Sequence, residues 1–119
     1  MKNNYGKYAE SLAVFYLFCK GYKILARNQI TGRGTSAGEI DIIARKGKFL
    51  VFVEVKKRQS LEKAAYAISD KQKKRIFRGA EAFLSKNPAY RSSDIRFDAV
   101  LIKLPFFIAH IQNAWEQNL

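Results

Sequence analysis

The segment 48–58, with the sequence KFLVFVEVKKR, restricts the fold of this chain more than any other part of it. Over its first half every residue after the lysine is apolar, so a strand formed here would be covered on both faces, as in a sheet flanked by helices. Towards its end one face becomes charged, with Glu54, Lys56 and Arg58 at alternate positions. A buried strand whose far end becomes charged is where an α/β protein is expected to place its functional site. We therefore predict an α/β fold with a site at the end of this strand.

The remaining pattern predicts two helices and further strands in one domain, residues 1–119, because a chain of 119 residues has the length of a single domain. Apolar residues at three- and four-residue spacing favour helices, and β-branched runs favour strands. The expected elements are a helix over 4–20, strands over 22–30, 38–44 and 48–58, a helix over 69–86, a strand over 95–102, and a strand or short terminal element over 107–112.

Two local features follow from these elements. A turn at Gly47 and Lys48 would join two strands into a hairpin in which Lys46 pairs with Phe49. In the first helix, the apolar stripe is expected to comprise positions 5, 8, 9, 12, 15, 16 and 19. The only cysteine, Cys19, lies on that stripe, and we expect it in the core, because one cysteine excludes an internal disulfide.

The positive charge is concentrated in the middle of the chain. Lys and Arg number 22 and Asp and Glu 10, a formal net charge of +12. Residues 45–78 carry twelve basic and three acidic side chains, hence nine of these net charges. Such a surface indicates a polyanionic partner, and we expect nucleic acid, DNA rather than RNA, and no membrane. The absence of a long apolar stretch or a signal-peptide pattern predicts a soluble, cytoplasmic protein.

Asp41, Glu54 and Lys56 are the residues whose side chains and spacing suit catalysis or metal binding. Alternation places Glu54 and Lys56 on one face, and the hairpin register places Asp41 opposite Glu54. Two facing carboxylates repel, but a divalent cation between them would offset their charge, and oxygen ligands suit Mg²⁺ or Mn²⁺. Val55, between Glu54 and Lys56, is included in the expected metal site. The alternative is an ordinary ion pair at a strand end, with Asp41 bound by loop amides.

Glu10, on the first helix, is a further candidate ligand. Its neighbours at three, four and seven positions are Ala13, Val14 and Leu17, so it lies on an apolar flank. It is either a third acidic ligand, or a carboxylate that lies at the margin of the helix stripe or interacts with the positive end of the helix dipole. Two other polar residues, Asp98 and His110, are expected to have structural roles.

The strings GEIDIIA (38–44), VFVEVKKR (51–58), AISDKQKKR (67–75) and RFDAV (96–100) resemble the YraN-like family of uncharacterised bacterial proteins. That family looks like part of the PD-(D/E)XK nuclease superfamily, close to Holliday junction resolvases. The resemblance implies a restriction-endonuclease-like, three-layer core with a mixed central sheet flanked by helices. It also implies a catalytic metal site of Asp41, Glu54 and Lys56, with Glu10 facing it and Gln72 nearby as an auxiliary residue.

These observations predict a Mg²⁺-dependent endonuclease acting on DNA, with branched or distorted DNA as candidate substrates. Similarity to junction resolvases allows a homodimer that cuts symmetrically. The alternatives are a non-catalytic nucleic-acid-binding module that retains the fold, and an interaction protein that docks on an acidic protein or on ribosomal RNA. The residues expected to contact phosphates are Lys57, Arg58, Lys71, Lys73, Lys74, Arg75 and Arg78.

Overall fold

A computed structural model describes residues 4–30, 39–57, 68–103 and 107–115 of the chain. Arg58 and the segment 31–38, read as a loop from its sequence, lie outside these residues. The elements, in chain order, are α1 (Asn4–Cys19), β1 (Lys23–Ile30), β2 (Glu39–Lys46), β3 (Phe49–Lys57), α3 (Asp70–Lys86), the 3₁₀ helix η1 (Pro88–Tyr90), β4 (Asp94–Lys103) and β5 (Phe107–Ile111). The expected order of elements is confirmed, and the segment after position 106 forms a strand.

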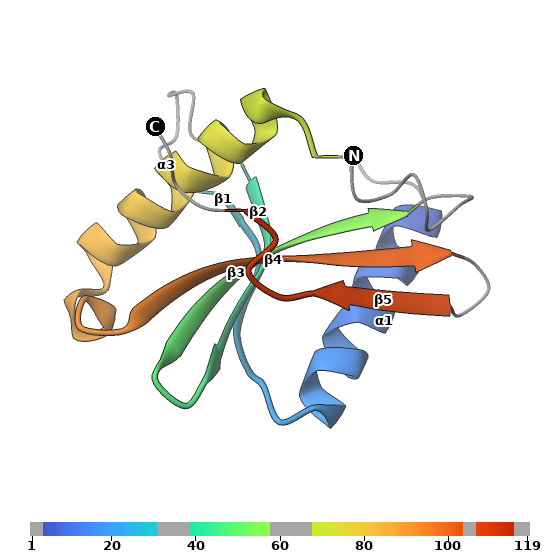
Figure 1. The fold of residues 1–119 in the computed structure, drawn as a ribbon, viewed down its shortest axis with the longest axis horizontal. Coiled ribbons are helices and arrows are strands. Elements are labelled where there is room, and N and C mark those ends of the chain that lie inside the picture. The colour runs from blue at the N-terminus through green and yellow to red at the C-terminus, as the bar shows by residue number, and fades with distance from the viewer. Residues whose placement is uncertain (1–3, 31–38, 58–67, 104–106, 116–119) are drawn as a thin grey trace.

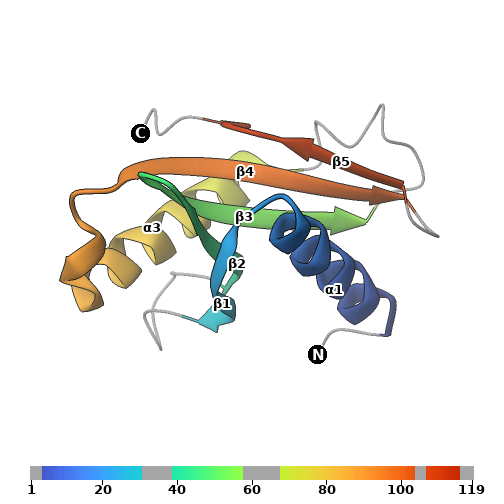
Figure 2. The same ribbon diagram turned by 90° about the horizontal axis from the view of Figure 1, so that it is seen from below.

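The strands form one mixed sheet in which spatial order follows chain order, β1-β2-β3-β4-β5. Three of the neighbouring pairs are antiparallel, while β3 and β4 run parallel and are connected across α3 (Figures 1 and 2). In the β2–β3 hairpin, Lys46 pairs with Phe49, so the predicted register is confirmed. Gly47 lies in the turn at φ 58°, a left-handed conformation that glycine adopts without steric cost.

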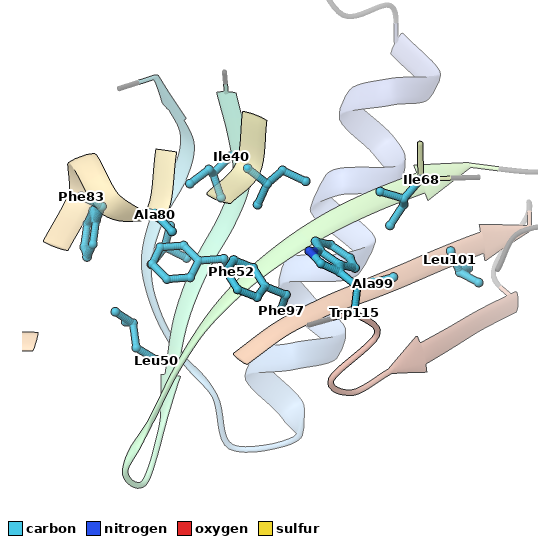
Figure 3. Close-up of a cluster of buried hydrophobic side chains, with 12 residues drawn as sticks. Ile40, Leu50, Phe52, Ile68, Ala80, Phe83, Phe97, Ala99, Leu101 and Trp115 are labelled. Atoms are coloured by element: carbon cyan, nitrogen blue, oxygen red, sulfur yellow. The ribbon is translucent and has the colours of Figure 1, made fainter. Parts of the chain in front are cut away.

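The sheet is covered on both faces, as the two-sided apolar pattern of β3 predicted. Val51 and Val53 pack in a cluster with residues of α1, whereas Leu50 and Phe52 pack on the opposite face with residues of α3. On the α3 face, the ring of Phe52 packs against Phe83 and Phe97 (Figure 3). Together α1, the sheet and α3 make three layers, so the α/β prediction with a mixed, helix-flanked sheet is confirmed.

The buried face of α1 differs from the predicted stripe. Ala9, Ala13 and Leu17 face the sheet and are almost fully buried, whereas Phe15 is 66% exposed and Cys19 is exposed. The prediction that Cys19 lies in the core is therefore wrong. The helix carries apolar residues on more than one face, and it packs through the face whose small alanines permit close approach to the sheet. This rotation also buries Glu10, the neighbour of Ala9 (Glu10 is 2% exposed).

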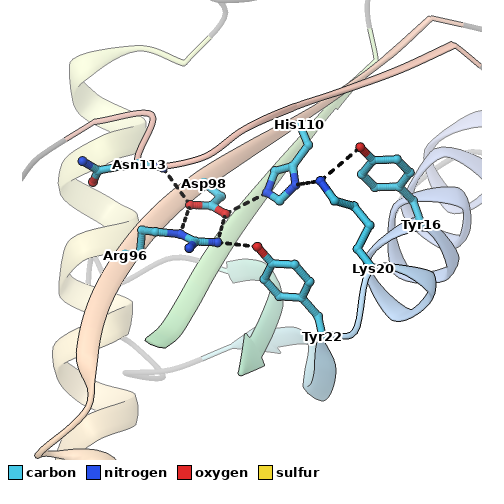
Figure 4. Close-up of polar contacts among 7 residues, drawn as sticks. All are labelled: Tyr16, Lys20, Tyr22, Arg96, Asp98, His110 and Asn113. Carbon is cyan, nitrogen blue, oxygen red and sulfur yellow. Dashed lines mark hydrogen bonds and ion pairs between the residues drawn. The ribbon is translucent and has the colours of Figure 1, made fainter. Parts of the chain in front are cut away.

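A group of polar side chains around the buried Asp98 links the end of α1 and the residue before β1 to β4 and β5 (Figure 4). Asp98, fully buried, accepts hydrogen bonds from Nε and Nη2 of Arg96, at 2.9 and 2.8 Å, and from the backbone N–H of Asn113. Nε2 of His110 lies 2.7 Å from Oδ2 of Asp98. Arg96 also donates to the hydroxyl of Tyr22. The structural roles expected for Asp98 and His110 match these contacts.

Burial opposes ionisation of Asp98, but the hydrogen bonds from His110, Arg96 and the Asn113 amide outweigh it, and the pKa of this carboxyl lies below its usual range. Nδ1 of His110 is 3.3 Å from the ammonium group of Lys20, which can only donate. Nδ1 is therefore the acceptor, and Nε2 carries the proton shared with Asp98.

Within the described residues, no helix combines the length and apolarity needed to cross a membrane.

Candidate metal centre

Asp41 and Glu54 come together where the β2–β3 hairpin opens. The regular pairing of the two strands ends at Ile42 and Val53, and the next residue on each strand is one of these two acids. Oδ2 of Asp41 then accepts a hydrogen bond of 2.9 Å from the backbone N–H of Val55. The carboxylate thus takes the place of a backbone acceptor and is held against the strand that carries Glu54 and Lys56. Val55, included in the expected metal site, contacts Asp41 through this N–H.

The path of β2 changes at Asp41. Ile40 packs in the cluster on the α3 face and Ile42 in the cluster on the α1 face, although strict alternation would place both on the same face. On the neighbouring strand, Arg27 pairs with Ile42, and the next residue, Asn28, has a left-handed backbone with φ 51°. Residues other than glycine adopt this conformation rarely, and asparagine is among those that tolerate it. Both strands are therefore irregular next to Asp41.

Glu54 is 8% exposed and shares a hydrogen bond with Asp41. Burial, that hydrogen bond and the negative charge of Asp41 raise the pKa of Glu54 from 4.5 to about 8, and Lys56 opposes the shift only in part. Nζ of Lys56 lies 3.5 Å from Oε2 of Glu54, and its side chain is 17% exposed. The two side chains therefore share a face, as predicted. Burial and Asp41 therefore favour the protonated form of Glu54, and a further cation beside the two acids would favour the ionised form.

Two further carboxylates, those of Glu10 and Glu39, lie close to Asp41. One oxygen from each of these three acids lies within 4.8 Å of the others. Glu10 comes from the buried face of α1, and Glu39 is the exposed first residue of β2. Glu10 is one of the predicted ligands, whereas Glu39 is not. The available signal was its position two residues before Asp41 on a predicted strand.

The donor set fits a hard divalent cation. Carboxylate oxygens are the ligands that Mg²⁺ and Mn²⁺ prefer, and Asp41 belongs both to the pair with Glu54 and to the group with Glu10 and Glu39. Burial, together with the hydrogen bond and the negative charge of Asp41, opposes the ionisation of Glu54 among these carboxylates. A cation among them would offset the repulsion, and Lys56 lies close enough to act on a group bound beside it.

Gln72, expected near the site, caps α3. Its side chain accepts a hydrogen bond from the backbone N–H of Ser69, while the Ser69 hydroxyl accepts one from the backbone N–H of Gln72. This reciprocal arrangement is a capping box. The sequence Ser-x-x-Gln before the helix carried that signal.

Most of the predicted phosphate-contacting residues are exposed. Lys73 is half-buried and forms an ion pair, with its Nζ 4.0 Å from Oδ1 of Asp70. The exposed members are Lys57, Lys71, Lys74, Arg75 and Arg78. All except Lys57 belong to the first half of α3.

Known proteins are similar in sequence to this chain over nearly its whole length. The model of the uncharacterised protein family UPF0102 matches residues 9–102. A UPF0102 protein of Paramagnetospirillum magneticum is 46% identical over 110 residues, which is 92% of this chain and 85% of that protein. A UPF0102 protein of Nitrobacter winogradskyi is 45% identical over 113 residues, 95% of this chain and 92% of that protein. The matched range contains Glu10, Asp41, Glu54 and Lys56.

Proposed function

The chain belongs to the UPF0102 family, and from this membership and the acidic site on α1, β2 and β3 we propose that it is a Mg²⁺- or Mn²⁺-dependent endonuclease that hydrolyses phosphodiester bonds in DNA. One observation carries the proposal. At the open end of a covered strand pair, Asp41 lies close to both Glu54 and Glu10, and Lys56 lies beside Glu54. Buried acids gathered around a shared carboxylate serve no packing purpose but suit metal-assisted hydrolysis.

The residues of the site would have different roles in the reaction. Asp41, Glu54 and Glu10 would hold the metal, which when bound supplies a Lewis acid for the phosphate and lowers the pKa of a water. The ammonium group of Lys56, mostly buried and 3.5 Å from Glu54, can donate to the attacking water or to a phosphate oxygen. The hydrogen bond from Val55 fixes the Asp41 carboxylate relative to both.

The basic residues supply the attraction for a polyanion. The exposed cations Lys71, Lys74, Arg75 and Arg78 lie on the first half of α3, next to Ile76, which packs in the same cluster as Ile40 beside the site. Phosphate contacts hold DNA without reading its sequence, so recognition of DNA shape, including branched structures, fits this surface better than recognition of bases. Resemblance to junction resolvases makes a homodimer part of the proposal.

The second candidate is a nucleic-acid-binding module without catalysis. The observation that favours it is the high pKa of Glu54, because a protonated Glu54 beside Lys56 forms a stable arrangement without metal. Cleavage separates the two candidates, since both predict binding.

The test is cleavage of single-stranded, duplex, flap and four-way-junction DNA by the purified protein with Mg²⁺, Mn²⁺ or a chelator. Glu54→Gln and Lys56→Met are each expected to lower the cleavage rate by about 10²–10³-fold. Their matched controls are Glu81→Gln and Lys86→Met, exposed residues of the second half of α3. Cleavage that persists in chelator or in both site variants contradicts the proposed site, and binding without cleavage of any substrate favours the second candidate.

A further inference from the structure

An open hollow of about 560 Å³ lies between α1 and the ends of β1 and β2. Its lining residues are Lys7, Glu10, Ser11, Arg27, Asn28 and Glu39. The volume falls in the range of about 300–1,000 Å³ that is typical of ligand-binding pockets. Because Glu10 and Glu39 belong to the acidic group with Asp41, the hollow opens directly onto the candidate metal centre.

The hollow is lined by two acidic and two basic side chains. The buried Glu10 and the exposed Glu39 supply the acids next to Asp41, while Lys7 and Arg27 supply exposed cations. Neither cation belongs to the basic surface of α3, which packs on the other face of the sheet.

Arg27 is held by two groups of α1. Its Nη2 lies 3.3 Å from the hydroxyl of Ser11 and 3.6 Å from Oε1 of Glu10. The Arg27 side chain is nevertheless 44% exposed, and a guanidinium carries five N–H donors in a rigid fork. The contacts with α1 therefore orient the fork and leave N–H groups for an anion, and phosphate is the anion whose geometry this fork matches best.

We propose that the hollow receives a backbone phosphate of the DNA, next to the phosphate that is cleaved, with Arg27 and Lys7 as its cationic contacts. This inference rests on the proposed function, because the metal centre defines which phosphate is cleaved. The acids at the centre repel a phosphate that arrives alone, and fixed cations beside them offset that repulsion. The DNA strand then passes over the end of the β2–β3 pair, held by α3 on one face of the sheet and by Arg27 and Lys7 on the other.

Binding of a short duplex DNA, with Ca²⁺ in place of Mg²⁺, tests the inference without requiring cleavage. Each phosphate contact contributes about 0.9 to the slope of log affinity against log salt. Arg27→Met and Lys7→Met are each expected to flatten that slope by about that amount. Arg91→Met, a change at an exposed arginine in the turn before β4, is expected to leave it unchanged.

The same variants separate phosphate binding from a purely structural role. If Arg27 serves the substrate, Arg27→Met raises KM for DNA at least tenfold more than it lowers kcat, and Arg27→Lys, which keeps the charge but not the fork, restores the salt slope and only part of the affinity. An unchanged salt slope in a folded Arg27→Met protein overturns the inference and leaves Arg27 as a counter-ion of Glu10. If Arg27→Met unfolds because Glu10 loses its partner, the double variant Glu10→Gln/Arg27→Met removes both charges and is compared with Glu10→Gln alone.

Failure of the inference is distinguishable from failure of the proposed function. Cleavage with an unchanged slope in both variants overturns the role of the hollow and leaves the nuclease intact. A flattened slope in a protein that cleaves nothing supports the phosphate site and refutes the nuclease. Absence of DNA binding by the unmodified protein overturns both.

Discussion

The backbone N–H of Val55 donates a hydrogen bond of 2.9 Å to Oδ2 of Asp41 and so fixes an acid of one strand against the backbone of its neighbour. The residues on either side of Val55 are Glu54 and Lys56. One strand pair therefore sets the relative positions of three candidate catalytic side chains. The structure of the site depends on this contact as much as on the charges around it.

Replacing Asp41 by Asn keeps an acceptor for the Val55 N–H but removes a negative charge. The pKa of Glu54 is expected to fall below about 8 in this variant, because the hydrogen bond and the charge of Asp41 both contribute to raising it. Carbon-13 NMR titration of the side-chain carboxyls measures the shift. Asp94→Asn, which changes an exposed acid at the start of β4, is the control and should leave Glu54 as it is. An unchanged Glu54 pKa in Asp41→Asn would show that burial alone raises it.

The raised pKa of Glu54 also predicts how the stability of the metal-free protein depends on pH. Its pKa is raised from 4.5 to about 8 on folding, so the folded chain binds more protons than the unfolded chain between these values. The contribution of this carboxyl to stability is complete below pH 4.5 and is lost as the pH rises through about 8. Urea unfolding in chelator, from pH 5 to 9, is expected to show a loss that is absent in Glu54→Gln. Equal pH profiles for the two proteins would contradict the high pKa.

Metal binding is expected to act in the opposite direction. A divalent ion requires Glu54 ionised, so binding releases a proton and tightens as the pH approaches 8. Calorimetric titration with Mn²⁺ in two buffers of different ionisation enthalpy measures the released proton. Glu10→Gln should weaken the binding, and Glu81→Gln, on the outer surface of α3, should not. Binding that is independent of pH would remove Glu54 from the ligand set.

The buried Asp98 is expected to be a main source of stability. Asp98→Asn leaves the charge of Arg96 without its bidentate partner, a change that costs about 3–5 kcal/mol in buried pairs. Asp94→Asn, which removes an exposed pair with Lys48, is expected to cost no more than about 1 kcal/mol. Chemical denaturation measures both changes, and equal costs would contradict the role assigned to Asp98.

The same carboxyl has a lowered pKa, so its stabilising contribution is present above pH 3.8. It is lost as the pH falls through the folded-state value. Acid unfolding of Asp98→Asn should therefore lack the corresponding step below pH 3.8.

Substitutions at the start of α3 distinguish two roles of Gln72, helix capping and catalysis. Ser69→Ala is expected to lower stability by about 1 kcal/mol, through the lost cap of α3. Gln72→Glu keeps the capping box, because glutamate serves in the same position, and should leave stability almost unchanged. If Gln72 assists the reaction, this variant loses cleavage while remaining as stable as the unmodified protein. Unchanged stability together with unchanged cleavage would assign Gln72 to the cap alone.

The sequence carried enough information to predict the sheet and the central pair of the site. Two-sided apolarity marked β3 as covered, and the short turn at Gly47 fixed the register that brings Asp41 to Glu54. These features depend on residues close in sequence, where periodicity and turn chemistry are decisive.

Other parts of the site could not be predicted because they depend on departures from periodicity or on distant contacts. The change of face between Ile40 and Ile42, opposite the left-handed Asn28, is invisible to an alternation pattern. The rotation of α1 depends on which apolar face fits the sheet, and Phe15 resembles a core residue in sequence although it is exposed. The contacts of Arg27 with α1 arise only when β1 packs beside the helix.

The sequential order of the strands has a consequence for how the site assembles during folding. Asp41 and Glu54 are joined by a hairpin, so closing a short loop brings them together at a small cost in chain entropy. The parallel pairing of β3 with β4 must wait for the whole crossover through α3, and parallel contacts of this kind form slowly. The repelling acids therefore meet in the part of the chain that can fold earliest, before the helix that brings Glu10 and the strand that brings Asp98 need to be in place.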